Sequence, residues 1–456
     1  MTRAEPGPVE GAVARFLNSF DKPARLLVAV SGGGDSVGLL IALDEALKSG
    51  RFPGFSLSAC TIDHGLRTAS TDEARWVAAL CAGRGIAHTT RCWSGPKPQR
   101  GVQAAAREAR HALLVEAVRD LGAEAIVTAH NSDDQRETVA MRGARRNDGA
   151  GLAGIAPATL VHNAVWLLRP LLGVSREDIR AFLRRCGQGW LDDPSNANRA
   201  FERVRVRLHA MSAAGETEGT HPASIDDTGW TAAARARHLA GRDGAAFLDS
   251  AVRVHDATLA FVPAPGVAAV TASDAALQAL LALCAVLGGR EHRRGKAAAD
   301  RLSAFLERGV LSRLTAGRVV FDRRREGLFL YREQRGLASL RIPAGESAVW
   351  DGRFRVRNLG EVPLLVQPGA AAGAVDMSAP PGIPDGVVRR AGRSRPVAVD
   401  GEGRAVVAAS LAIAPILAPY DRYLPVFDLP VAQALARLFG LPPQPPLPLA
   451  MGFQPG

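Results

Sequence analysis

Short apolar runs alternate with amphipathic stretches throughout the first two hundred residues, and this alternation constrains the fold more than any other feature. Strands are indicated at 26–30, 55–62, 86–92 and 125–129. The predicted helices lie at 37–47, 71–82, 102–121, 133–141 and 175–186. Strands that alternate with helices form βαβ units around a parallel sheet. We therefore predict an α/β fold whose N-terminal, doubly wound parallel sheet binds its ligand beyond the carboxyl ends of the strands.

The later part of the chain changes character. At about 150 residues per domain, a chain of 456 residues suggests roughly two to four domains. Residues 211–228 are polar and rich in Gly and Thr, 230–310 are rich in Ala, and 311–365 read as short strands. We predict an α/β domain at 1–212, a linker at 213–228, a helical middle domain at 229–330 and a small mixed α/β C-terminal domain at 331–456.

Net charge, cysteine content and apolar runs restrict the partners, the metal sites and the location that we expect for this chain. The net charge of +11 favours a polyanion, either nucleic acid or a membrane surface, although a coding bias towards Arg would give the same balance. Five cysteines without a C-x-x-C pair argue against a disulfide framework or a cysteine zinc site. The N-terminus lacks an apolar signal core and no apolar run is long enough to span a bilayer, so we expect a soluble cytoplasmic protein without a membrane partner.

A Gly-rich loop follows the first predicted strand and opens a helix. It consists of Ser31, Gly32, Gly33, Gly34, Asp35 and Ser36. Its glycines let backbone N–H groups approach an anion, and the helix start adds partial positive charge. A tight strand–helix connection without a ligand would look similar. The loop lacks the G-x-x-x-x-G-K-[ST] pattern of a Walker A motif, so a different mode of phosphate binding is indicated.

Polar residues also follow the second strand and open the long helix. Asp63 and His64 stand beside a Gly turn, where they could act in chemistry or simply cap a loop. Arg107 and Arg110 lie three residues apart on the predicted helix and therefore on one side of it. They could neutralise phosphate charge or remain solvated surface arginines.

The fourth strand is followed by His130 and then by an acidic helix start. Asp133, Asp134 and Glu137 share one helical face because they are spaced three and four residues apart. Carboxylates that converge near nucleotide phosphates suggest Mg²⁺, which prefers oxygen ligands. The alternative is an acidic first turn that complements the helix dipole.

Taken together, these motifs resemble those of the tRNA(Ile)-lysidine synthetases, within the PP-loop (N-type) ATP pyrophosphatase superfamily. The resemblance covers about residues 25–208 in the family's order. It rests on AVSGGGDSVGLL, TIDHGLR, GVQAAAREAR, TAHNSDDQRET, LLRPLL and WLDDPSNANRAFERVRVR. SGGGDS is typical of the superfamily, whereas DHGLR, DDQ-x-ET and DDPSN are more specific to the lysidine branch.

The resemblance implies a two-step ligase reaction with ATP as substrate and Mg²⁺ as cofactor. The O2 atom of the wobble cytidine (C34) of a tRNA(Ile) with a CAU anticodon attacks the α-phosphate of ATP, and pyrophosphate leaves. The ε-amine of free L-lysine then attacks C2 and expels AMP, which leaves lysidine. The middle and C-terminal domains are then expected to bind tRNA, and a homodimer is one candidate assembly.

The resemblance also implies roles for individual residues. The nucleotide-binding residues are Ser31, Gly32, Gly33, Gly34, Asp35 and Ser36, and the catalytic ones are Asp35, Asp63, His64, Arg107, His130, Asp133, Asp134 and Glu137. Asp133, Asp134 and Glu137 are the candidate Mg²⁺ ligands, and Asp63, Asp133 and Asp134 are the candidate acceptors of the lysine proton. Arg203, Arg205 and Arg207 would form one basic face on a strand for tRNA phosphates, or else an interdomain salt-bridged segment.

The sequence departs from the family pattern at two positions, and three other functions compete with lysidine synthesis. Asn131 stands where the family has a second His, and Val204 stands where it has Asn. A PP-loop tRNA sulfur transferase generally needs catalytic cysteines beside a motif, which this chain lacks. The basic charge opposes a ligase or amidotransferase for a small molecule, and the intact motifs oppose a non-catalytic tRNA-binding protein.

Overall fold

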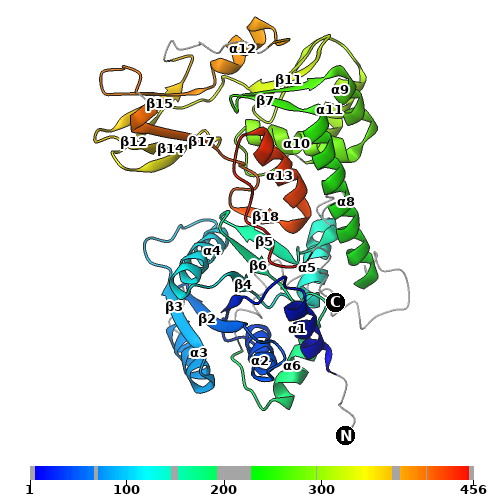
Figure 1. The fold of residues 1–456 in the computed structure, drawn as a ribbon, viewed down its shortest axis with the longest axis vertical. Coiled ribbons are helices and arrows are strands. Elements are labelled where there is room, and N and C mark those ends of the chain that lie inside the picture. Colours follow the sequence, from blue (N-terminus) through cyan, green and yellow to red (C-terminus); the bar gives the residue numbers. More distant parts are fainter. Residues whose placement is uncertain are drawn as a thin grey trace. The chain divides into compact units, whose positions relative to one another are not determined.

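The computed structural model describes residues 6–65, 70–144, 152–192, 227–293, 295–371, 381–406 and 408–450 (Figure 1). The chain divides into two compact units. The first comprises Met1–Arg235 and Pro445–Gly456, and the second comprises Ala236–Gln444. The finer division into a linker, a middle domain and a C-terminal domain stays a prediction, and residues 213–226 lie outside the described part.

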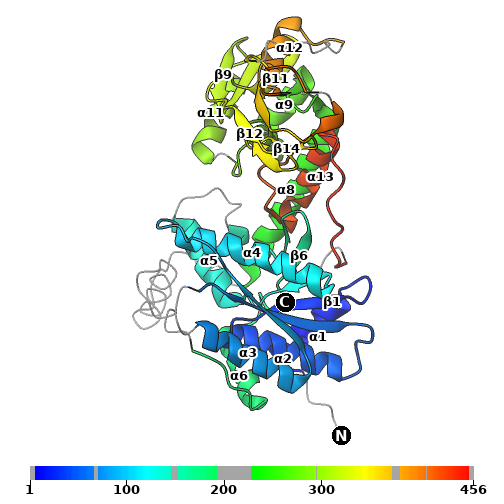
Figure 2. The same ribbon diagram turned by 90° about the vertical axis from the view of Figure 1, so that its left-hand side faces the viewer.

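The first unit contains a sheet flanked by helices. Its elements are α1 (Pro8–Asn18), β1 (Arg25–Ala29), α2 (Gly34–Lys48), β2 (Ser56–Asp63), α3 (Ser70–Arg84), β3 (Ala87–Cys92), α4 (Val102–Leu121), β4 (Ala125–Val127), α5 (Ser132–Ala144), β5 (Ala158–Val161), β6 (Val165–Leu168) and α6 (Arg176–Arg185). The strands lie in the order β5-β6-β4-β1-β2-β3, and all neighbouring pairs are parallel except the β5–β6 hairpin. Helices α1, α2, α3 and α6 cover one face, and α4 and α5 cover the other (Figure 2). The predicted doubly wound α/β fold is confirmed.

The strand order reverses at β1, and this reversal positions the ligand site. Strand β1 pairs with β2 on one side and with β4 on the other, and all of β4 is buried. The chain leaves β1 and β4 towards opposite faces of the sheet, which opens a crevice beyond their carboxyl ends. The loop that follows β1 and the residues that follow β4 therefore meet at this crevice.

A glycine lets α2 and α6 pack closely. A Cβ atom at Gly38 would lie 2.3 Å from Cγ2 of Ile179, so no larger residue fits there without movement. Ile179 is fully buried, and the two helices pack tightly along this side of the sheet. The packing fixes the start of α6 relative to the start of α2, on the same edge of the sheet.

The end of the described chain returns to the first unit. Leu449 forms an isolated β-bridge with Phe20, and the indole Nε1 of Trp166 donates a hydrogen bond of 3.1 Å to the carbonyl of Pro445. Leu449 is buried. Residues 445–450 therefore complete a unit whose other strands and helices end more than two hundred residues earlier in the chain.

The second unit combines helices with three antiparallel sheets. Its elements are α8 (Asp227–Ala251, which begins in the first unit), β7 (Arg253–His255), β8 (Leu259–Pro263), α9 (Ala264–Ala272), α10 (Asp274–Leu287), α11 (Lys296–Glu307), β9 (Arg313–Ala316), β10 (Val319–Arg323), β11 (Gly327–Arg332), β12 (Leu340–Ile342), β13 (Ser347–Trp350), β14 (Phe354–Asn358), β15 (Leu364–Pro368), α12 (Asp385–Gly392), β16 (Pro396–Val399), η3 (Ala408–Ser410), β17 (Leu411–Pro415), β18 (Tyr423–Pro425), η4 (Val426–Asp428) and α13 (Leu429–Leu438). The sheets have the orders β7-β8-β11-β10-β9, β12-β15-β16 and β13-β14-β17. The helical region and the mixed sheets after it agree with the prediction, except that the β7–β8 hairpin interrupts the Ala-rich helical stretch.

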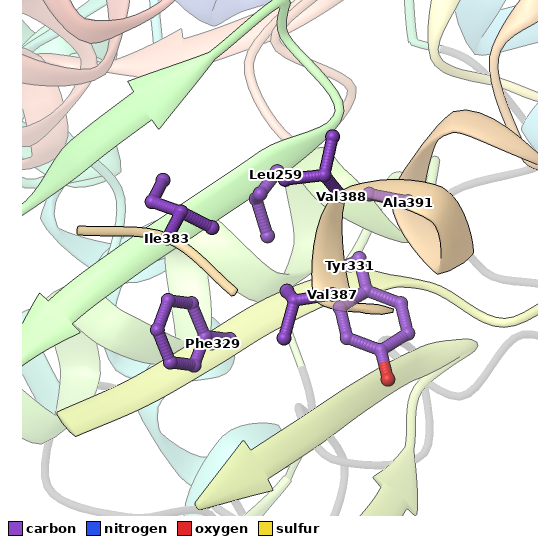
Figure 3. Close-up of a cluster of buried hydrophobic side chains, with 7 residues drawn as sticks. All are labelled: Leu259, Phe329, Tyr331, Ile383, Val387, Val388 and Ala391. Atoms are coloured by element: carbon purple, nitrogen blue, oxygen red, sulfur yellow. The ribbon is translucent and has the colours of Figure 1, made fainter. Parts of the chain in front are cut away.

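Helix α12 closes one face of the five-stranded sheet through a small apolar cluster (Figure 3). The cluster is made by Leu259, Phe329, Tyr331, Ile383, Val387, Val388 and Ala391. It brings α12 against β8 and β11, far apart in the sequence. No single helix among the described residues is long and apolar enough to cross a membrane, and only the pair α9 and α10, bent by 116°, reaches that length and hydropathy together.

A buried carboxylate joins the five-stranded sheet to the β13–β14 hairpin. Asp351, in the turn of that hairpin, accepts hydrogen bonds from Nε of Arg332 on β11 at 3.0 Å and from Nε of Arg353 at 2.7 Å. Arg318 contacts the same carboxylate, and Arg353 also lies over the ring of Trp350. Pairing makes the burial of these guanidinium groups tolerable, because an unpaired buried charge is costly.

Candidate active site

The Gly-rich loop after β1 has a backbone that requires glycine. Gly32 has φ +87°, and a Cβ atom there would lie 2.8 Å from Cδ1 of Leu191. The backbone N–H of Leu191 donates a 2.9 Å hydrogen bond to the carbonyl of Gly32. The loop is therefore fixed both by its own turn and by the segment that follows α6.

Two serine hydroxyls hold the loop in shape. Ser36 Oγ donates to the carbonyl of Gly33 at 2.9 Å and accepts from the backbone N–H of Ser31 at 3.1 Å. The hydroxyls of Ser31 and Ser36 lie 3.2 Å apart. The loop is thus preorganised at the start of α2, where backbone N–H groups and the helix dipole favour an anion.

A cavity of about 270 Å³ lies against this loop. It is lined by Ala29, Ser31, Gly33, Gly34, Asp35, Ser36, Arg110, Thr128, Ala129, His130, Asp134, Arg176, Arg180, Leu191 and Asp192. The lining comes from the ends of β1 and β4, from the starts of α2, α5 and α6, from Arg110 on α4 and from the segment after α6. This is the crevice expected at the reversal of strand order, and its mixture of N-terminal helix turns and guanidinium groups suits a polyphosphate.

Arg176, the first residue of α6, contacts two acidic side chains of the cavity, Asp35 and Asp134, and Glu137 beside it. Its Nε donates to Oδ2 of Asp35 at 3.2 Å, and its Nη2 and Nη1 lie 3.6 Å from Asp134 Oδ1 and 4.0 Å from Glu137 Oε1. Burial raises the pKa of Asp35, and the neighbouring Arg176 partly opposes this rise. The guanidinium therefore favours an ionised Asp35 in a poorly hydrated place.

The remaining acidic residue at the start of α5 is directed elsewhere. Asp133 Oδ2 accepts the backbone N–H of Arg176 at 2.8 Å, and its Oδ1 lies 3.8 Å from Arg136. Asp134 is held by Asn131, because each backbone N–H donates to the other side chain, at 3.0 and 3.2 Å. Asn131, which departs from the family motif, therefore caps α5 and orients Asp134.

Asp63 lies at the end of β2 with its carboxylate well satisfied. Oδ1 accepts from the Ser70 hydroxyl at 2.6 Å and from the backbone N–H of Gly65 at 2.7 Å, and Oδ2 accepts from the Thr71 hydroxyl at 3.2 Å. These hydrogen bonds lower the pKa of Asp63, with the bond from Ser70 contributing most. The carboxylate ties the end of β2 to the start of α3.

A second cavity of about 260 Å³ adjoins the first. Its lining consists of His64, Gln103, Ala106, Arg107, Arg110, His111, Thr128, His130 and Leu167. Arg110, Thr128 and His130 border both cavities. Burial is the main cause that lowers the pKa of His64, and it lowers the pKa of His111 to about 3, so His111 is neutral at any working pH.

The structure brings most of the predicted site residues together. The first cavity is lined by Ser31, Gly33, Gly34, Asp35, Ser36, His130 and Asp134, and the second by His64, Arg107 and His130. Gly32 shapes the loop, whereas Asp63, Asp133 and Glu137 line neither cavity. Arg203, Arg205 and Arg207 lie outside the described residues. Their catalytic and binding roles stay predictions.

Sequence reasoning did not single out Arg176 or Arg180, both of which reach the first cavity. A signal was present, because a helix is predicted at 175–186, and the Ser175 hydroxyl does cap its start by accepting the backbone N–H of Asp178 at 3.0 Å. A helix that starts after a parallel strand has its first turn at the carboxyl edge of the sheet. The first residues of α6 could have been placed at the site on that ground.

The carboxylates of the cavity offer a partial set of metal ligands. Within the described ranges, no group of three or more His, Cys, Asp or Glu side chains is arranged to hold a metal ion by itself. Magnesium usually takes one or two carboxylates together with substrate phosphates and waters. Asp35 and Asp134 both line the cavity and fit that pattern, and Mg²⁺ stays a prediction.

The fold and the Gly-rich loop together define the class of protein. A doubly wound sheet whose first strand ends in SGGGDS at the reversal of strand order is the arrangement of a PP-loop protein that binds ATP, and the family model described as "PP-loop domain" matches residues 8–214. The tRNA(Ile)-lysidine synthase of Rhizobium meliloti (strain 1021) is 44% identical over 446 residues, which cover 95% of this chain and 96% of that protein. The chain belongs to the tRNA(Ile)-lysidine synthase family.

Other relatives agree with this assignment. The tRNA(Ile)-lysidine synthase of Mesorhizobium japonicum is 40% identical over 458 residues, covering 95% of this chain and 96% of that protein. The enzyme of the same name from Brucella melitensis biotype 2 is 40% identical over 340 residues, or 74% of each chain. Among solved structures, the U34-tRNA thiolase NcsA from Methanococcus maripaludis has a TM-score of 0.40 and 16% identity, covering 50% of this chain and 76% of that one, a likeness too low to bear on function.

Proposed function

We propose that this protein is an ATP-dependent ligase that converts the wobble cytidine of tRNA(Ile) into lysidine with free L-lysine, and that its target carries a CAU anticodon. One observation carries the proposal: the loop at residues 31–36, which contains Asp35 and lies beside Asp134, has a phosphate-binding geometry. It occurs in a chain that a relative named tRNA(Ile)-lysidine synthase matches over 95% of its length. The products are the modified tRNA, AMP and pyrophosphate.

The loop would hold the leaving pyrophosphate. The amide groups at the start of α2 and the hydroxyls of Ser31 and Ser36 lie around one wall of the cavity, with Arg176 and Arg180 on another. Preorganised donors of this kind stabilise charge that develops on a departing group. The O2 atom of the cytidine attacks the α-phosphorus, the bond from that phosphorus to the bridging oxygen breaks, and pyrophosphate leaves with the electron pair.

In the second half-reaction the lysine amine attacks C2 of the activated base. The C2–O2 bond breaks, AMP leaves with that oxygen, and the amine loses a proton. Of the three predicted proton acceptors, the geometry favours Asp134, because it lines the cavity whereas Asp63 and Asp133 do not.

We also propose that Mg²⁺ binds in the cavity as the counter-ion of the ATP phosphates. The predicted ligands are Asp133, Asp134 and Glu137, and the lining of the cavity adds Asp35 to this set. When bound, the ion would neutralise charge on the departing pyrophosphate.

Contact with tRNA would extend beyond the cavity. The net charge of +11 suits a polyanion, and Arg203, Arg205 and Arg207 are proposed phosphate contacts. We also propose that the chain acts as a homodimer, which light scattering coupled to gel filtration would test.

The decisive experiment supplies purified protein with ATP, radiolabelled L-lysine and unmodified tRNA(Ile). We expect label to enter the tRNA with a CAU anticodon, with one AMP formed per lysine, and not a tRNA whose wobble position is changed to U. An Asp35→Ala/Ser36→Ala variant should lose label transfer by at least roughly a hundredfold, the usual scale for removed transition-state contacts. A wild-type protein that transfers no lysine, or that thiolates the tRNA instead, would contradict the proposal.

A further inference from the structure

Arg176 makes unusually loose contacts for an arginine inside a protein. Only its Nε–Asp35 contact, at 3.2 Å, has hydrogen-bond length, and its contacts with Asp134 and Glu137 are 3.6 and 4.0 Å long. Its side chain keeps 20% of its surface exposed, towards the nucleotide cavity. The guanidinium is therefore shared among three carboxylates without a bidentate bond to any of them.

An arginine of the same unit shows what a structural role looks like. Arg169 is 4% exposed, and its Nη1 donates to the carbonyl of Ala156 at 2.7 Å and to the hydroxyl of Thr159 at 2.9 Å. Those short bonds fix the strand end to its neighbours. Arg176 lacks such bonds through its guanidinium, although its backbone N–H is firmly held by Asp133.

The balance of charge at the cavity explains why a weakly held guanidinium group is useful there. Asp35, Asp134 and Glu137 bring three negative charges close together, and a nucleotide triphosphate would add more. Carboxylates and phosphates can share a site only with cations between them. A guanidinium held mainly by long ion-pair contacts can give way to a cation that binds oxygen more strongly.

We infer that Arg176 is a displaceable counter-ion: its guanidinium and a divalent cation compete for the same carboxylate oxygens of Asp35 and Asp134. Once displaced, the guanidinium stays in the wall of the cavity, where a phosphate can become its partner. Arg176 is thus a positioning residue that holds the carboxylates close together and adjusts how tightly the site holds its metal. The inference rests on the proposed nucleotide site, but it concerns metal affinity and not lysine transfer.

The test uses Mg²⁺ alone, without ATP, tRNA or lysine, and follows the melting temperature of the full chain during a magnesium titration. Arg176→Gln is expected to raise the apparent affinity for Mg²⁺ roughly tenfold or more, the scale of one charge-assisted hydrogen bond. The matched control is Arg180→Gln, which removes a positive charge from the same cavity and the same helix. Among the described carboxylates, none forms an ion pair with Arg180, and its charge acts on Asp35 more weakly than that of Arg176 does, so its loss should change the affinity by about twofold to threefold at most.

Two further variants test whether the effect on Mg²⁺ affinity depends on Asp35 and on the charge of residue 176. Adding Asp35→Asn to Arg176→Gln should remove the gain in Mg²⁺ affinity. Arg176→Lys keeps the charge and should fall between the wild type and Arg176→Gln, so it serves if the Gln variant does not fold. The inference is overturned if Arg176→Gln and Arg180→Gln have the same affinity for Mg²⁺, or if the gain in affinity persists when Asp35→Asn is added. Where only the Lys variant can be measured, an affinity for Mg²⁺ equal to that of the wild type would overturn it. Because lysine transfer is not measured, failure of the proposed function would not mimic any of these results.

Discussion

Gly32 shows how one residue can decide whether the phosphate loop forms. Its left-handed backbone and its contact with Leu191 both exclude a side chain. The glycines and serines of the loop were predictable from the sequence as a candidate phosphate-binding turn, because they stand between a predicted strand and a predicted helix. The contribution of Arg176 was not, since it reaches Asp35 from 141 residues away.

Replacement of Gly32 by Ala should therefore impair nucleotide binding. We expect a loss of about 1–3 kcal/mol in the free energy of unfolding, from backbone strain plus the clash with Leu191. ATP affinity should fall roughly tenfold or more, because the loop amides move. Gly85→Ala is the control: its φ is +71° but no atom lies within 4 Å of the added Cβ, so it carries strain without a clash. Isothermal titration and urea unfolding measure both effects, and equal ATP affinity in the two variants would refute the expectation.

The lowered pKa of Asp63 predicts a pH dependence of stability. A carboxyl group whose pKa is lower in the folded state than in the unfolded state stabilises the fold while it is ionised. For Asp63 this contribution is complete above the pKa of the unfolded chain, near 3.8, and it is lost as the pH falls through the lower pKa of the folded state. Asp63→Asn removes the ionised acceptor of Ser70 and Thr71. The gap in unfolding free energy between wild type and variant should be complete at about pH 7 and should shrink below about pH 4. A gap that stays constant across this range would show that charge plays no part.

At the scale of elements, long periodic helices were predicted well, whereas two short hairpins, β5–β6 and β7–β8, were not. Helix α4 has the predicted bounds, and glycines at both of its ends adopt the left-handed conformation that ends a helix. The β5–β6 and β7–β8 hairpins turn through His162–Asn163 and Asp256–Ala257, all with positive φ. Because neither turn contains glycine, the usual hairpin signal is missing from the sequence.

The α2–α6 contact predicts a destabilising effect from a substitution that usually stabilises helices. Gly38→Ala places a methyl group 2.3 Å from Ile179, and overpacking of this kind costs about 1–3 kcal/mol. Gly83→Ala in α3 has open space around its Cβ and should instead stabilise by about 0.5–1 kcal/mol. Chemical denaturation would compare the two. Partial recovery in a Gly38→Ala/Ile179→Ala double variant would assign the loss to this contact, and the absence of any recovery would count against it.

At the scale of the whole molecule, the division into two units follows contacts that composition does not reveal. The polar stretch at 211–228 indicated where the chain changes character, but the last described residues carry no pattern that assigns them to the first sheet. Their partners, Phe20 and Trp166, become neighbours only in the folded chain. Long-range pairings of this kind cannot be inferred from local periodicity.

A chain shortened after residue 444 should keep its second unit but weaken its first. It would lose the bridge from Leu449 to Phe20 and leave the indole N–H of Trp166 without its acceptor. We expect a loss of about 2–4 kcal/mol, from a buried leucine and a hydrogen bond. Hydrogen exchange of peptides around α1, β5 and β6 should rise, while exchange in the five-stranded sheet should not. Uniform exchange in both units would contradict this account.

The return of residues 445–450 also sets an order of events during synthesis. A ribosome produces the phosphate loop early, yet the sheet that carries it gains residues 445–450 only after the whole second unit has been synthesised. Chains that stop before residue 445 would therefore have a less stable first unit, which proteases would cut more readily. The first unit therefore reaches its full stability only after the sequence of the second unit has been synthesised.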